Sequence, residues 1–180
     1  MKRLLRWAAL VSPGTEELVL HTEDGVISAD SVVEGGRAGE SARVSYHLEL
    51  DPAWQVRRVA VQDRDGRVDL LREPDGTWRD GDGVTLPALA GCTDVDISVT
   101  PFTNTLPIRR LQLAAGESAE IRVVYIQSPG LNVRPVRQRY TNLGDGRYRY
   151  EALETGFAAV LTVDADGLVI EYPGLFRRTP

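Results

Sequence analysis

The chain has 180 residues, 42% hydrophobic and 26% charged, which is ordinary composition for one globular domain with its own core. Its 26 acidic and 21 basic residues give a formal net charge of −5, which argues against a general nucleic-acid-binding protein. The single cysteine, Cys92, excludes an intramolecular disulfide framework and fits a reducing compartment. We therefore expect one domain that spans residues 1–180.

The N-terminal segment, residues 1–11, predicts a first strand or a packed arm. Arg6 interrupts its apolar stretch and Ser12-Pro13-Gly14 follows directly, so the long apolar region of a signal peptide is missing. The longest apolar run elsewhere, residues 157–163, is far too short for a membrane span. We expect a soluble, cytoplasmic protein with no membrane span.

Short strands separated by Asp-Gly turns dominate the rest of the chain. In residues 44–50 apolar and polar side chains alternate, as in a strand with one buried face. Further strands are predicted at 17–22, 25–34, 54–62, 67–72, 94–100, 120–127, 133–141, 147–153, 157–164 and 168–172, and a short helix at 86–91. The expected fold is all-β: a many-stranded antiparallel β-barrel-like or strongly curled sheet with an internal cavity and few or no helices.

Two predicted strands are apolar on both faces, residues 121–126 and 157–163. Such a strand is covered on both sides, or one of its faces lines an apolar cavity. If a cavity is present, we expect Tyr125, Phe157 and Leu161 among its lining residues.

Asp94 and Asp96 lie two residues apart and therefore share one face of a strand. Two carboxylates on one face can act as acid and base or bind a cation. Alternatively, they form ion pairs with Arg109 and Arg110. No metal-binding spacing, phosphate-binding glycine loop or nucleophile motif is present, so we expect no cofactor and no metal.

The segment 100–110 predicts a stiff, irregular loop. Pro101 and Pro107 fix the backbone and remove two hydrogen-bond donors. Thr103 and Asn104 can hydrogen-bond to the neighbouring backbone. This corner either shapes the mouth of a ligand site or clamps the barrel shut.

A hairpin is predicted around a loop at residues 142–146. With that loop, Thr141 lies opposite Arg147 on the neighbouring strand. Tyr140 then lies opposite Tyr148, and Gln138 lies opposite Tyr150 on the same face of the hairpin. The face with Gln138 and the tyrosines is amphipathic, because its large rings carry hydroxyl groups that need partners when buried. It either packs against the core or forms a wall of a pocket for a ligand with a polar head. The other face carries arginines: Arg137, Arg139, Arg147 and Arg149.

Residues 94–111 resemble the D-x-D-x-x-x-T-P-x-T-N-T-L-P-I-R-R-L signature of the bacterial family described as putative glycolipid-binding, formerly a domain of unknown function. Residues 135–140 resemble its P-x-x-Q-x-Y stretch. The resemblance continues through segments that include Trp7, 148–150, Phe157, 163–164, 167–169 and 172–174. It implies a many-stranded β-barrel-like fold with an internal cavity, similar to lipid and lipoprotein carriers.

These observations predict a binding protein for a lipid-like or glycolipid-like amphiphile held in a β-barrel cavity. The alternative is an enzyme acting on a small amphiphile, with Asp94 or Asp96 as general base and Arg109 or Arg110 stabilising an anion. The candidate ligand-binding residues are Arg109, Arg110, Asn104, Thr103, Gln138, Tyr140, Tyr150, Asp94 and Asp96.

Overall fold

Fourteen strands form one sheet in the computed structural model, which describes residues 1–35 and 42–180. Hydrogen-bonded neighbours follow the order β7-β6-β5-β4-β3-β2-β1-β14-β13-β12-β11-β10-β9-β8. All neighbours are antiparallel except β8 and β9, which run parallel. The strands are Lys2–Ala9 (β1), Gly14–Glu23 (β2), Val26–Gly35 (β3), Ala42–Leu50 (β4), Val56–Asp63 (β5), Gly66–Arg72 (β6), Trp78–Asp80 (β7), Asp94–Ile97 (β8), Ser118–Gln127 (β9), Asn132–Gly144 (β10), Arg147–Ala152 (β11), Phe157–Val163 (β12), Val169–Tyr172 (β13) and Phe176–Thr179 (β14).

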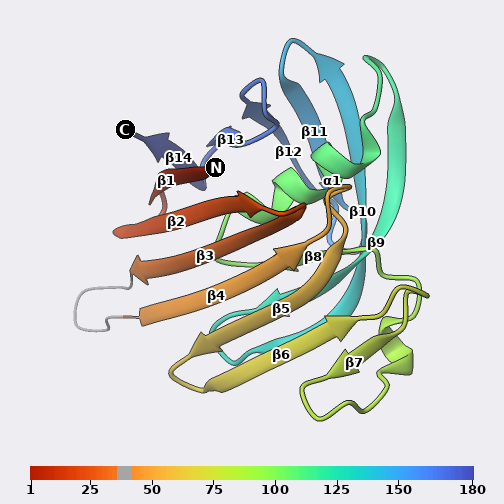
Figure 1. The fold of residues 1–180 in the computed structure, drawn as a ribbon. Helices are drawn as coiled ribbons and strands as arrows, with labels where there is room; N and C mark the ends of the chain where they lie inside the picture. Colours follow the sequence, from red (N-terminus) through yellow and green to blue (C-terminus); the bar gives the residue numbers. More distant parts are fainter. Residues whose placement is uncertain (36–41) are drawn as a thin grey trace.

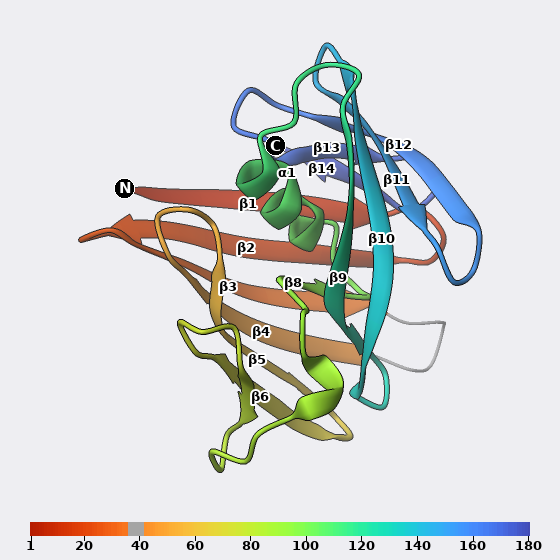
Figure 2. The ribbon, with the colours of Figure 1, turned by 90° about the vertical axis from the view of Figure 1, so that its right-hand side faces the viewer.

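The sheet curls strongly around a helical segment without closing into a barrel (Figures 1 and 2). Its two ends, β7 and β8, form no strand pair with each other within the described residues. A side chain links these ends instead, because the indole Nε1 of buried Trp78 donates to the backbone oxygen of Cys92 at 3.0 Å. The predicted all-β, curled architecture is thus confirmed.

The segment 100–110 is helical, so the predicted irregular loop is wrong. It forms a 3-10 turn, Phe102–Asn104 (η2), followed by the α-helix Thr105–Leu111 (α1). Pro107 is tolerated because the first turn of a helix leaves backbone N–H groups without intrahelical partners. A crossover between parallel strands is usually helical, and η2 and α1 provide it between β8 and β9. The helix predicted at 86–91 is the short 3-10 turn Pro87–Leu89 (η1).

Two hydrophobic cores lie on either side of β9 and α1. On β9, Val124 and Ile126 belong to the first core, which is built mainly from β1–β8, while Val123 belongs to the second, built mainly from β9–β13. Leu106 and Ile108 of α1 divide between the cores in the same way. The prediction that 121–126 is covered on both sides is confirmed for these apolar residues, all of them buried.

The strand β12 differs from this prediction on its outer face. Val160 is 40% exposed, so that face is not covered. Phe157, on the inner face, is 43% exposed but lines a pocket, which is the second alternative given for this strand. Leu161 lies wholly buried in the second core and does not line that pocket, so its predicted place in the cavity wall is wrong.

The register of the β10–β11 hairpin also differs from the prediction. Tyr140 lies opposite Tyr150 rather than Tyr148, and Gln138 lies opposite Ala152. The cause is a tighter turn at Asp145 and an irregularity between residues 142 and 144, which lengthen β10. The shift is two residues, and a side chain keeps its face under an even shift. The predicted polar and aromatic face is therefore preserved.

Candidate functional site

A pocket of ≈ 250 Å³ lies on the inner side of the sheet between β8 and the strands β9–β14. We call it the Asp96 pocket. Its wall combines several aromatic rings with a small number of polar groups, the usual composition of a small-molecule site. The aromatic residues are Tyr125, Tyr150, Phe157, Tyr172 and Phe176. The principal polar residues are Asp96, Asn104, Arg134, Gln138 and Glu154.

Asp96 presents a carboxylate to this pocket. Its Oδ2 accepts a hydrogen bond from Gln138 Nε2 at 2.6 Å, and its Oδ1 accepts a longer one from Thr103 Oγ1 at 3.3 Å. Burial raises the pKa of Asp96, and the hydrogen bonds from Gln138 and Thr103 act in the opposite direction. A carboxylate offers about four lone-pair positions, so these two bonds leave Asp96 with capacity for a ligand.

A buried hydrogen-bonded frame holds the polar wall in place. Gln138 Nε2 donates to the Tyr150 hydroxyl at 3.1 Å as well as to Asp96. The Tyr140 hydroxyl donates to Asn104 Oδ1 at 2.9 Å, and Asn104 Nδ2 donates to the Pro101 carbonyl at 3.2 Å. The structure thus brings Asp96, Thr103, Asn104, Gln138, Tyr140 and Tyr150 together, six of the nine predicted residues.

Asp94 and Arg110 form a separate, closed pair. The Arg110 guanidinium donates to Asp94 through Nε at 3.0 Å and Nη2 at 2.6 Å. The Asp94 side chain is fully buried, and neither residue lines the Asp96 pocket. This is the ion pair that the sequence offered as one alternative, and it joins β8 to α1.

Arg109 points to a different part of the molecule. Its guanidinium lies 4.8 Å from the ring centroid of Trp54 and donates through Nη1 to the Asp166 carbonyl at 2.9 Å. Successive residues of a helix lie on different faces, so Arg109 and Arg110 cannot reach the same site. Asp96 therefore faces neither of these arginines, and the Asp/Arg cleft required by the predicted enzyme does not form.

Several residues of the pocket wall were missed by the sequence reasoning. Arg134, Glu154, Tyr172 and Phe176 reach the wall from four different segments. No short-range pattern marks them, because their proximity depends on the curl of the sheet. Tyr125 and Phe157, which the sequence analysis expected in a cavity wall, both line this pocket.

A second pocket, of ≈ 260 Å³, adjoins the Asp96 pocket. Ser98 and Phe176 line both pockets and therefore stand between them. The second pocket is mostly apolar, and we call it the Trp7 pocket. Its apolar wall includes Trp7, Val33, Val44 and Val99.

Glu16 lies at the edge of the Trp7 pocket but is only 2% exposed. Its Oε1 accepts hydrogen bonds from the hydroxyls of Tyr46 at 2.5 Å and Ser31 at 2.8 Å, while Thr100 Oγ1 lies 2.7 Å from Oε2. Desolvation raises the pKa of Glu16 to about 7, although these hydroxyls lower it. Glu16 was not singled out from the sequence, because its partners come from three distant segments.

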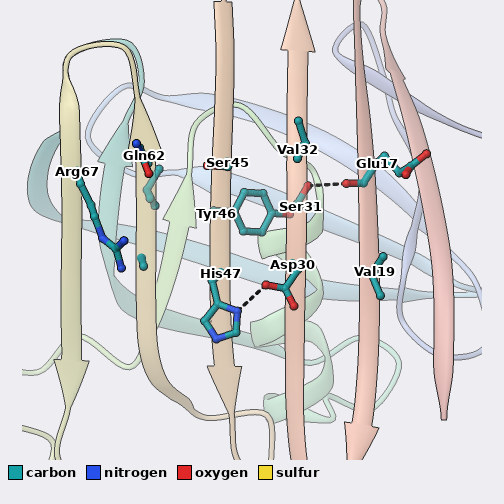
Figure 3. Close-up of a pocket in the computed structure, with 12 residues that line it drawn as sticks. Glu17, Val19, Asp30, Ser31, Val32, Ser45, Tyr46, His47, Gln62 and Arg67 are labelled. Carbon is teal, nitrogen blue, oxygen red and sulfur yellow. Dashed lines mark hydrogen bonds and ion pairs between the residues drawn. The ribbon is translucent and has the colours of Figure 1, made fainter.

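A third candidate is a groove of ≈ 430 Å³ on the outer face of β2–β6, shown in Figure 3 with α1 behind the sheet. His47 Nδ1 lies 2.7 Å from Asp30 Oδ1, and its Nε2 lies 3.2 Å from Glu49 Oε1. These groups satisfy one another at the surface. Within the part of the chain that the structure describes, no group of three or more His, Cys, Asp or Glu side chains could hold a metal ion.

Comparison with known proteins matches residues 4–178 to the family described as "Putative glycolipid-binding". The chain belongs to this family. A crystal structure of a DUF1089 family protein from Pseudomonas aeruginosa is 45% identical, with a TM-score of 0.79 over 91% of this chain and 92% of that chain. No curated protein matches.

In this member of the glycolipid-binding family, the motif 94–111 forms β8, η2 and α1. It contributes Asp96 and Asn104 to the Asp96 pocket and Leu106 and Ile108 to the two cores. The motif therefore takes part in both the site and the packing. No helix among the described residues has the length and apolar character that crossing a membrane requires.

Proposed function

We propose that the protein binds a lipid-like or glycolipid-like amphiphile, with the polar head in the Asp96 pocket and the apolar part in the Trp7 pocket. The observation that carries this proposal is the adjacency of the two pockets across Ser98 and Phe176. One wall is rich in polar and aromatic groups and the other is apolar, which matches the two ends of an amphiphile.

The chemistry of the Asp96 pocket suits a head group with several hydroxyls. Asp96 accepts hydrogen bonds, while the exposed Arg134 donates them at the rim. The rings of Tyr150 and Tyr172 offer apolar faces against which a sugar ring can pack. Thr103, Asn104 and Tyr140 hold this wall in position through their hydrogen bonds.

In this proposal Asp94, Arg109 and Arg110 act as a clamp. The Asp94–Arg110 pair fixes α1 on β8, and Arg109 ties α1 to Trp54 and the Asp166 carbonyl. They position the strand that carries Asp96 without contacting the ligand.

The experiment is calorimetric titration with dodecyl glucoside below its micelle concentration. Val136 lines the Asp96 pocket, so Val136→Trp should fill it and weaken binding by about tenfold or more. Val160→Trp, on the exposed outer face of β12, is the matched control and should bind as the wild type does. Absence of binding to the wild type, or equal binding by both variants, would contradict the proposal. Native mass spectrometry of protein purified without detergent should additionally show whether a ligand is retained.

A further inference from the structure

Of the three charged side chains that line the Asp96 pocket, Glu154 and Arg134 have charged or aromatic partners, whereas Asp96 has neither. Glu154, at the rim, accepts from the backbone N–H of Arg137 with both carboxylate oxygens at 3.0 Å and from its Nε at 3.3 Å. The Arg134 guanidinium lies 4.9 Å from the ring centroid of Tyr125. Asp96 has only the neutral partners Gln138 and Thr103, and no ion pair joins it to a described residue.

Three aromatic rings gather in the wall of the same pocket. The ring centroids of Tyr150 and Phe157 are 6.3 Å apart, those of Tyr150 and Tyr172 are 6.2 Å apart, and those of Phe157 and Tyr172 are 6.3 Å apart. The rings thus form a triangle in the wall of the pocket that Asp96 also lines. Aromatic faces attract cations, and the attraction grows when the site is shielded from water.

We infer that the head group of the ligand carries a protonated amine, which is held between the Asp96 carboxylate and the ring cluster of Tyr150, Phe157 and Tyr172. This inference rests on the proposed function and specifies the class of ligand. An ammonium group supplies three hydrogen-bond donors. It also supplies the positively charged partner that the Asp96 carboxylate lacks among its protein contacts.

Other head groups leave the site less well satisfied. A neutral hydroxyl can donate to Asp96 but leaves its negative charge uncompensated in a partly desolvated wall. An anionic head group would be repelled by the carboxylates of Asp96 and Glu154. The cation that lines the pocket, Arg134, lies at the rim. A protonated amine pairs with the Asp96 carboxylate. It leaves in place both the cation–π contact of Arg134 with Tyr125 and the ion pair of Glu154 with Arg137.

The test compares two probes that differ at one substituent of the sugar: dodecyl glucosaminide, whose amine is largely protonated at neutral pH, and dodecyl glucoside, which carries a neutral hydroxyl in its place. Calorimetry on the wild-type protein should give about tenfold or tighter binding for the amine. Dodecylamine, used as a third probe, separates an amino sugar from a simple amine: binding equal to the glucosaminide identifies the amine alone as the recognised group.

Asp96→Asn keeps the shape of the side chain and removes its charge. The variant should lose the preference for the amine, so that both glucosides bind with similar affinity. Glu151→Gln is the matched control, because it neutralises a carboxylate of β11 that does not line the pocket and should retain the preference.

The outcomes separate the two proposals. Equal binding of both glucosides to the wild type would overturn the amine inference and leave amphiphile binding intact. Failure of every probe to bind would overturn the proposed function. A preference for the amine that persists in Asp96→Asn would also overturn the inference, because it would place the recognised charge elsewhere. The wild-type comparison needs no variant and therefore does not depend on whether Asp96→Asn folds.

Discussion

Asp94 and Asp96 lie two residues apart on the same face of β8, yet their surroundings are opposite. Asp94 is fully buried against the guanidinium of Arg110, whereas Asp96 faces a pocket with only neutral partners. The strand alone sets which way both side chains point. The elements packed against each side chain determine its role. The helix α1 covers Asp94, whereas the wall formed by β10–β13 leaves a pocket in front of Asp96.

Glu16 sharpens the contrast, because it also lacks an ion-pair partner among the described residues. Three hydroxyls enclose its carboxylate, and it is almost completely buried. Thr100, at the start of the helical segment, contacts Glu16, while Thr103 contacts Asp96. One short segment therefore completes a closed carboxylate site on one side and an open one on the other.

The largest expected effect comes from breaking the closed pair. Arg110→Ala would leave Asp94 buried without its cation and should lower the free energy of unfolding by about 3–5 kcal/mol. Urea denaturation followed by circular dichroism measures this loss. The double variant Asp94→Asn with Arg110→Met is the control, and it should recover part of the stability because no buried charge remains. A loss below about 1 kcal/mol for Arg110→Ala would contradict a structural role for the pair.

The next effect is a pH dependence that originates at Glu16. Its pKa is raised from 4.5 to about 7, so the folded protein holds a proton that the unfolded chain releases between these values. The contribution of Glu16 to stability is therefore fully present below about pH 4.5 and falls by about 3 kcal/mol as the pH rises through 7.

Glu16→Gln imitates the protonated acid and should remove this dependence. Unfolding at a series of pH values should show variant and wild type converging at low pH, with the variant the more stable above pH 7 by about 3 kcal/mol. A constant difference across the whole range would show that Glu16 does not titrate in the folded protein.

A smaller effect is expected at the neighbouring arginine. Arg109→Ala removes one cation–π contact with Trp54 and one hydrogen bond to a backbone oxygen, and should cost about 1 kcal/mol. Thermal unfolding measures the change, and titration with dodecyl glucoside should give unchanged affinity. Weakened binding at unchanged stability would place Arg109 at the ligand instead of in the clamp.

The smallest effect on stability is expected at Asp96, whose carboxylate faces the open pocket. Asp96→Asn removes a carboxylate whose charged form burial disfavours, so its melting temperature should equal or slightly exceed that of the wild type. Differential scanning calorimetry at neutral pH provides the measurement. Destabilisation comparable to that of Arg110→Ala would mean that Asp96 is a structural residue like Asp94.

Much of the fold was predictable from local patterns. Alternating residues and Asp-Gly turns marked most strands, since both signals lie within a few residues. The short strands β7 and β14 were missed because three or four residues carry too little periodicity. The helix α1 was missed because Thr105 and Pro107 favour turns, and the crossover between β8 and β9 overrides that preference.

The site was predictable only where residues share a strand or a hairpin. Gln138 and Tyr150 were placed on one face correctly, although their register was wrong. Arg109 was grouped with the ligand residues because the sequence was interpreted as a loop, in which neighbouring side chains can turn the same way. The approach of Tyr172 and Phe176 to Asp96 depends on the curl of the whole sheet, which no local pattern encodes.

The most direct test of amphiphile binding across the two pockets is a crystal structure of the protein with dodecyl glucoside. We expect the sugar to lie beside Asp96 and Gln138, with the alkyl chain passing Phe176 toward Trp7. A sugar seated in the outer groove beside His47 (Figure 3), with the inner pockets unoccupied, would contradict it.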